Sequence, residues 1–89
     1  MERLSANVVA VIPVLDEAAT IASVIAELRQ TSVERVIVVD GGSRDDTVAR
    51  AQAAGAEVIS EPCPGYGRAC LAGVRAADAA EVVLFLDGD

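Results

Sequence analysis

Two carboxylates near the end of the chain have the type and spacing to hold a metal ion. The apolar run Leu84-Phe85-Leu86 leads into Asp87-Gly88-Asp89. A strand presents residues i and i+2 on one face, so we expect Asp87 and Asp89 to project together. Carboxylate oxygens suit Mg²⁺ or Mn²⁺, and Gly88 lets a phosphate approach. The motif predicts a divalent-cation site that carries a nucleotide diphosphate, although Asp-Gly is also an ordinary turn dipeptide.

Two glycine-containing segments could also contact a nucleotide. In Asp40-Gly41-Gly42-Ser43, the carboxylate can accept hydrogen bonds from a base N–H or a ribose hydroxyl, and the glycines let a ligand approach the backbone. The same residues also fit a tight turn followed by a helix cap. Gly65-Tyr66-Gly67-Arg68 could receive a phosphate at a helix N-terminus. Its glycines match no Walker or dinucleotide spacing, so a flexible helix entry is the simpler interpretation.

Composition narrows the class of protein. The chain has 89 residues, 53% of them hydrophobic but only 2% aromatic, so we expect one small domain with an aliphatic core. Its net charge of −7 argues against nucleic acids and anionic membranes as partners. The absence of histidine excludes the usual zinc signatures and Ser-His or Cys-His catalytic pairs. We expect Cys63 and Cys70 to be buried as small hydrophobes.

Targeting signals are not evident in the sequence. No apolar run approaches the roughly 20 residues that span a bilayer. Met1-Glu2-Arg3 lacks a signal-peptide pattern. We therefore expect a cytoplasmic protein.

Short apolar runs alternate with helical patterns along the chain. Runs with little polar alternation are typical of parallel strands that are covered on both faces. Pro13 should end the first of these strands, because proline cannot donate to a sheet ladder. Right-handed crossovers would then give an α/β fold, a Rossmann-like half-sheet of order βαβαβαβ with helices on both faces. The predicted strands are 7–12, 35–39, 57–60 and 81–86.

Three helices are expected between these strands. Asp16 is a good N-cap for the first, and Glu17 would lie at the positive end of its dipole. Ser43 and Asp46 are expected to cap the second, which should end before a left-handed C-cap at Gly55. The third covers about 68–77. The first helix has an apolar stripe at Ile21, Val24, Ile25 and Leu28, and the third should bury Cys70, Leu71, Val74 and Ala77.

In such sheets, ligands bind beyond the carboxyl ends of the strands, and the polar motifs of this chain gather there. Their order resembles that of a family-2 glycosyltransferase with a GT-A-type fold, closest to the polyprenyl-phosphate (dolichol-phosphate) sugar synthases. The resemblance lies in 12–17 (IPVLDE), 38–47 (VVDGGSRDDT), 65–69 (GYGRA) and 85–89 (FLDGD). The first turn lacks G-x-G-x-x-G, which argues against NAD or FAD binding, and no G-x-S-x-G elbow is present.

The resemblance implies a metal-assisted, inverting transfer of a sugar from a UDP- or GDP-sugar, with a polyprenyl phosphate as one acceptor to consider. It implies that Asp89 and Asp87 bind Mg²⁺ or Mn²⁺. Asp16 replaces the usual Asn. Gly41 replaces the second Asp of an Asp-Asp pair, which leaves the choice between uridine and guanosine open. The implied contacts to the nucleotide and sugar are Pro13, Leu15, Glu17, Val39, Asp40, Asp87 and Gly88.

The acceptor site and the catalytic base lie after Asp-x-Asp in that family. We therefore expect residues 1–89 to form a single donor-binding subdomain of a longer enzyme, inactive alone, with its catalytic residues still to be identified. Two alternatives are a non-catalytic nucleotide-binding fragment and a haloacid-dehalogenase-type phosphotransferase, in which Asp-x-Asp supplies the nucleophile. The edge of the fourth strand would be exposed, which predicts self-association.

Overall fold

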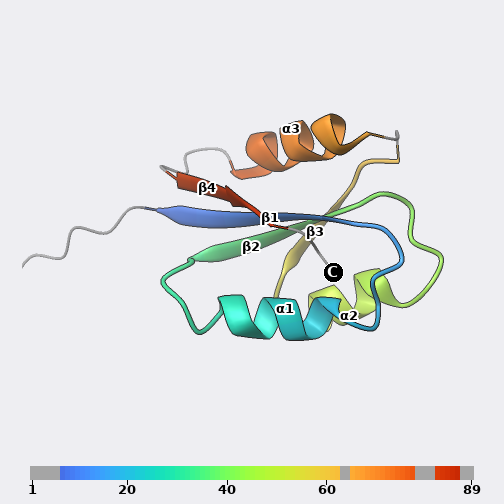
Figure 1. Cartoon of the computed structure of the whole chain (residues 1–89), viewed down its shortest axis with the longest axis horizontal. Coiled ribbons are helices and arrows are strands. Elements are labelled where there is room, and N and C mark those ends of the chain that lie inside the picture. Colours follow the sequence, from blue (N-terminus) through green and yellow to red (C-terminus); the bar gives the residue numbers. More distant parts are fainter. Residues whose placement is uncertain (1–6, 63–64, 78–81, 87–89) are drawn as a thin grey trace, which may run out of the picture.

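The computed structural model describes residues 7–62, 65–77 and 82–86, in which strands and helices alternate as predicted (Figure 1). The elements are β1 (Val8–Val14), α1 (Ile21–Leu28), β2 (Arg35–Asp40), α2 (Thr47–Ala53), β3 (Glu57–Ser60), α3 (Tyr66–Ala77) and β4 (Val82–Phe85).

The strands form one sheet in the order β3-β2-β1-β4, and every neighbouring pair is parallel. The two central strands, β1 and β2, are buried along most of their length, which explains their continuous apolar runs. Helices α1 and α2 cover one face of the sheet and α3 covers the other (Figure 1). The predicted α/β class, with helices on both faces, is confirmed.

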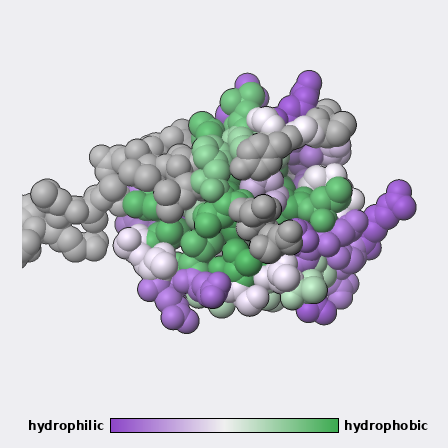
Figure 2. Space-filling model, viewed as in Figure 1, coloured by the Kyte–Doolittle hydropathy of each residue, from purple (hydrophilic) through white to green (hydrophobic). Residues whose placement is uncertain are grey.

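Alternation along β1 divides the core into two layers. Ile12 and Val14 pack with α1 and α2, whereas Val9 and Val11 pack on the side of α3. In the space-filling view, hydrophobic residues run across the middle of the molecule and hydrophilic ones collect at its periphery (Figure 2). Among the described residues, no helix has the length and apolar character needed to cross a membrane.

The expectation that Pro13 ends the first strand is wrong, because β1 continues through Pro13 to Val14. Alternate residues of a strand bond to opposite neighbours. The Val11 carbonyl accepts from Leu86 N at 3.0 Å, on the β4 side, and the Val14 carbonyl accepts from Gly41 N at 2.9 Å, on the β2 side. The backbone nitrogen of Pro13 therefore points to the β4 side, so its missing N–H costs no hydrogen bond to β2. On the β4 side, Pro13 lies beyond the described end of that strand.

Helix α1 begins later than predicted. Its apolar stripe is confirmed, with Ile21 and Ile25 buried, but its N-cap is Thr20 rather than Asp16. Asp16 adopts a left-handed conformation (φ 52°) that turns the chain before the helix can start. The amides of Thr20 and Ile21 then bond to the Glu17 carbonyl at 3.1 and 2.9 Å. Because its first turn contains no acidic residue, the predicted dipole role of Glu17 is also wrong.

Helix α2 has the predicted end but a different start. Asp46 occupies the N-cap without a side-chain capping bond, so the expected cap by Ser43 and Asp46 is wrong. At the other end, Gly55 has φ +100°, as expected for a left-handed C-cap. The amides of Gly55 and Ala56 bond back to Gln52 and Ala51 at 3.0 and 3.1 Å. This pair of bonds is a Schellman motif.

Helix α3 packs on the sheet through its small residues. Leu71 and Val74, predicted to be buried, are 50% and 42% exposed, whereas Ala77 is buried as predicted. A Cβ built on Gly73 would lie only 2.2 Å from Cγ1 of Val11, so the helix approaches β1 too closely for a larger side chain. The side turned to the sheet consists of Ala69, Ala72, Gly73, Ala76 and Ala77.

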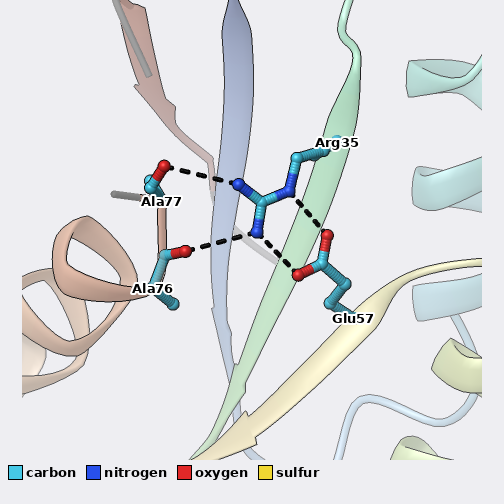
Figure 3. Close-up of polar contacts among 4 residues, drawn as sticks. All are labelled: Arg35, Glu57, Ala76 and Ala77. Atoms are coloured by element: carbon cyan, nitrogen blue, oxygen red, sulfur yellow. Dashed lines mark hydrogen bonds and ion pairs between the residues drawn. The ribbon is translucent and has the colours of Figure 1, made fainter. Parts of the chain in front are cut away.

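The C-terminal end of α3 is tied to the sheet by Arg35, the first residue of β2 (Figure 3). Its guanidinium donates to the carbonyls of Ala76 and Ala77 at 3.2 and 3.3 Å. These carbonyls belong to the last turn of the helix, where carbonyl groups have no intrahelical partner.

Candidate functional site

The candidate site lies at the carboxyl edge of the sheet, beside β1. From β1 the chain moves outward to β2 and β3, and it then returns to the opposite side of β1 as β4. The order of the strands along the chain therefore reverses beside β1, with β2 and β3 on one side of it and β4 on the other (Figure 1). Such a switch point leaves a crevice beyond the strand ends, where open α/β sheets bind their ligands. The loops after β1 (residues 15–20) and β2 (residues 41–46) form this edge.

Asp40, the last residue of β2, is the most buried charged side chain at this edge, at 6% exposure. Its Oδ2 accepts hydrogen bonds from the amides of Gly42 and Ser43, both at 3.1 Å, and so forms the predicted tight turn. Its Oδ1 is buried and has no hydrogen-bond partner among the described residues. A buried carboxylate oxygen without a donor is costly, which makes Oδ1 available to a ligand that brings one.

Leu15 and Gly41 lie next to each other beside Asp40. A Cβ built on Gly41 would lie 3.4 Å from the Val14 carbonyl oxygen and 3.9 Å from Cδ1 of Leu15. Leu15 is largely exposed, which makes it an apolar surface on which a flat base could rest. Val39 packs in the core on the α3 side. The nucleotide contacts implied for Leu15 and Val39 stay predictions.

The β1–α1 and β2–α2 loops are joined by reciprocal hydrogen bonds. Asp16 N donates to the Ser43 hydroxyl oxygen at 2.9 Å, and Arg44 N donates to Asp16 Oδ1 at 2.8 Å. The two side chains predicted to cap their own helices thus connect the two loops instead. Asp and Asn tolerate the left-handed backbone found at Asp16, so its replacement of the usual Asn preserves this arrangement.

A second set of bonds joins the same loops deeper in the molecule. Thr47 is fully buried, and its hydroxyl donates to Asp45 Oδ1 and accepts from Glu17 N at 2.9 Å. Thr47 N also donates to Asp45 Oδ1 at 3.0 Å, and Ala18 N donates to Asp45 Oδ2 at 3.3 Å. The hydroxyl bond is the main reason that the pKa of Asp45 lies below its ordinary value, and the Thr47 and Ala18 amides add to it.

Sequence reasoning missed the roles of Asp45 and Thr47. A signal was present, because a threonine two residues after an aspartate can bond back to that carboxylate. It did not reveal the partner on the β1–α1 loop, since Glu17 and Thr47 are far apart in the chain.

The glycine-rich entry to α3 is only partly described. Gly65 has φ +126°, a conformation that favours glycine, and its carbonyl accepts from Ala69 N at 3.2 Å. Arg68 is exposed in the first turn of the helix, which begins at Tyr66. Both features fit a phosphate contact as well as a plain helix entry, so the phosphate role stays a prediction.

The predicted metal motif lies outside the described residues, which include none of Asp87, Gly88 and Asp89. Within the described segments, no cluster of three or more Asp, Glu, Cys or His side chains could hold a metal ion. Of the two cysteines, Cys63 lies outside the described residues, and Cys70 is a half-buried free thiol.

Comparison with known proteins identifies the class. A sequence model of glycosyl transferase family 2 matches residues 9–89. The glycosyltransferase AglJ of Haloferax volcanii is 43% identical over 77 residues, which cover 86% of this chain and 25% of AglJ. Glucosyl-3-phosphoglycerate synthase of Mycobacterium tuberculosis is 41% identical over an alignment of 90 positions, gaps included, which covers 89% of this chain and 28% of that enzyme.

Solved structures give the same result. A crystal structure of the M. tuberculosis synthase with Mn²⁺, UDP-glucose and phosphoglyceric acid has a TM-score of 0.77 and 40% identity, covering 94% of this chain and 33% of that one. The chain therefore belongs to glycosyl transferase family 2, and its fold is that of the GT-A-type enzymes. It spans about a quarter to a third of the length of these relatives. The comparisons favour the glycosyltransferase over the haloacid-dehalogenase alternative.

Proposed function

We propose that this chain is the donor-binding part of a glycosyltransferase that takes its sugar from a UDP-sugar with the help of a divalent cation. The M. tuberculosis relative has been crystallised with Mn²⁺ and UDP-glucose, which supports uridine over guanosine. The reciprocally bonded loops beside β1 would receive the nucleotide, and the exposed Leu15 would support its base.

The observation that carries the proposal is the unpaired Oδ1 of Asp40. An ionised carboxylate only accepts hydrogen bonds, and the uracil ring of UDP keeps one ring N–H, since its other ring nitrogen is bonded to the ribose. A bond from that N–H to Oδ1 would pair a buried oxygen that otherwise has no donor. The neighbouring glycines, Gly41 and Gly42, have no side chains that would obstruct a base at this place.

A cation is required by charge. A diphosphate approaching a chain of net charge −7 is repelled unless a divalent ion lies between them. Asp87 and Asp89 would hold this ion, because paired carboxylates suit Mg²⁺ and Mn²⁺. When bound, the ion would neutralise negative charge on the diphosphate as it leaves the sugar.

The relatives bear on the acceptor as well as on the donor. Two structures of the M. tuberculosis synthase contain phosphoglyceric acid and glycerol 3-phosphate, so they lend no support to a polyprenyl phosphate acceptor.

Isothermal titration of the chain with UDP and GDP, with Mn²⁺ or with excess chelator, tests the proposal. We expect UDP to bind more tightly than GDP, and only when Mn²⁺ is present. Asp89→Ala should abolish binding. Asp40→Asn keeps an oxygen for the turn but places an amide at Oδ1, and should weaken UDP binding about tenfold. Asp46→Ala, an exposed neighbour without a capping bond, is the control and should bind like the parent chain.

Two results would contradict the proposal. One is the absence of UDP binding in the presence of Mn²⁺, and the other is equal affinity in excess chelator. Unchanged UDP affinity in Asp40→Asn would remove Asp40 from the site.

A further inference from the structure

We infer that Asp45 and Thr47 are positioning residues for the donor site, which hold the β1–α1 loop in the form that presents Leu15 and Glu17 to the nucleotide. This inference rests on the proposed function for its ligand. It goes further in assigning a role to two residues that do not themselves contact that ligand.

The geometry forms a directed chain of hydrogen bonds. Glu17 N–H donates to the Thr47 hydroxyl oxygen, and the hydroxyl hydrogen is donated to Asp45 Oδ1. An ionised carboxylate cannot donate, so it fixes the direction of the Thr47 hydroxyl and leaves its oxygen free to accept from Glu17. Hydrogen bonds that run in one direction strengthen one another.

These hydrogen bonds lie where the β1–α1 loop meets α1, so they can fix the loop in place. They hold the Glu17 amide, while the Glu17 carbonyl accepts the amides of Thr20 and Ile21 that begin α1. The second oxygen of Asp45 holds the next amide, that of Ala18. The junction between loop and helix is thus fixed from one side by α1 and from the other by Asp45 and Thr47.

Burial distinguishes this contact from ordinary loop bonds. Thr47 is fully buried at the first position of α2, so its hydroxyl cannot exchange these partners for water. Without the hydroxyl, the Glu17 amide would lack the acceptor that the structure gives it, and the loop would have to move to find another.

The test compares Thr47→Val, which removes the hydroxyl at nearly constant shape, with Thr47→Ser, which restores it. Amide hydrogen exchange measured by NMR should show at least tenfold faster exchange of Glu17 and Ala18 in Thr47→Val. Core amides such as that of Val38 should remain protected. Thr47→Ser should return the exchange rates to within about threefold of the parent chain, and Asp46→Ala should leave them unchanged.

Binding gives the second readout. In the presence of Mn²⁺, Thr47→Val should lower the affinity for UDP about tenfold. Its affinity for inorganic pyrophosphate, also with Mn²⁺, should stay within about twofold of that of the parent chain. Pyrophosphate lacks the base and ribose that the loop would contact. A merely destabilised protein would lose both ligands to the same degree.

The outcomes separate the two proposals. If the parent chain fails to bind UDP, the proposed function is wrong, and the exchange rates still decide whether Asp45 and Thr47 hold the loop. If Thr47→Val leaves the Glu17 and Ala18 rates unchanged, or weakens UDP and pyrophosphate equally, the positioning role is overturned.

Discussion

The guanidinium of Arg35 faces the carboxylate of Glu57 edge to edge, with Nε and Nη2 each 2.7 Å from one carboxylate oxygen. The opposite side of the same group donates to the carbonyls of Ala76 and Ala77 (Figure 3). One planar side chain therefore connects β2, β3 and the end of α3, which a lysine could not do with the same geometry.

Arg35→Ala should lower the free energy of unfolding by about 1 kcal/mol, as expected for charge-assisted bonds that solvent partly screens. The side chains of Arg35 and Glu57 are 36% and 52% exposed, which keeps the effect small. Arg35→Lys should recover little of the loss. The control is Arg50→Ala, since Arg50 lies 4.0 Å from Asp46 in an exposed pair and should cost about 0.3 kcal/mol. Urea denaturation measures both free energies of unfolding, and equal losses in Arg35→Ala and Arg50→Ala would contradict this interpretation.

The Arg35–Glu57 pair should also make stability depend on pH. The hydrogen bond from Arg35 holds the pKa of Glu57 below its ordinary value of 4.5. A carboxyl group with a lowered native pKa stabilises the fold above its unfolded pKa, and this stabilisation is lost as the pH falls through the native pKa.

We therefore expect the parent chain to be more stable than Glu57→Gln at pH 7. The gap should close as the pH falls below about 4.5. Denaturation of both proteins across this range measures it. The comparison cancels the contribution of Asp45, whose pKa is lowered as well. A gap that stays constant with pH would count against the pair.

Gly73→Ala should destabilise the protein by about 1–3 kcal/mol, because its Cβ would overlap Val11 and force α3 away from the sheet. Gly67→Ala is the matched control on the same helix. A Cβ built there meets nothing within 4 Å, so this change should stabilise the protein by up to about 1 kcal/mol. Thermal unfolding of both variants checks the prediction, which fails if the two melting temperatures shift in the same direction.

Gly55→Ala should cost about 1–2 kcal/mol, because its backbone has φ +100° and L-residues are strained there. Its Cβ would also lie 2.7 Å from Nη1 of Arg29, although that flexible side chain can move aside. Gly55→Asn should cost less, since asparagine tolerates this conformation better. An equal loss in both variants would indicate that Arg29, and not the backbone, sets the cost.

The order of the elements and the class of the sheet could be predicted from the sequence, because buried parallel strands appear as continuous apolar runs. The bounds of β3 were correct, and α2 ended before Gly55 as expected. The burial of α3 was not predictable from hydrophobicity. Leu71 and Val74 are its larger apolar residues, yet Gly73 and the alanines turn to the sheet, because the distance between helix and sheet decides which residues fit.

At the site, the sequence indicated which residues gather at the carboxyl edge but not how they bond. Asp16 and Ser43 are good helix caps by local rules. Each instead bonds to the loop that carries the other. Local rules cannot reveal a partner that only the sheet brings near. The same holds for Thr47, whose contact with Glu17 depends on the parallel pairing of β1 and β2.

The contact between Gly73 and Val11 also bears on how sequences of this family can diverge. The side chains at the two positions share one fixed volume between α3 and β1, so their combined volume is limited. A relative with alanine at the position of Gly73 should carry glycine or alanine where this chain has Val11. Residues on a helix and a strand far apart in the sequence should then be inherited as a pair, and a substitution at one should be followed by a substitution at the other.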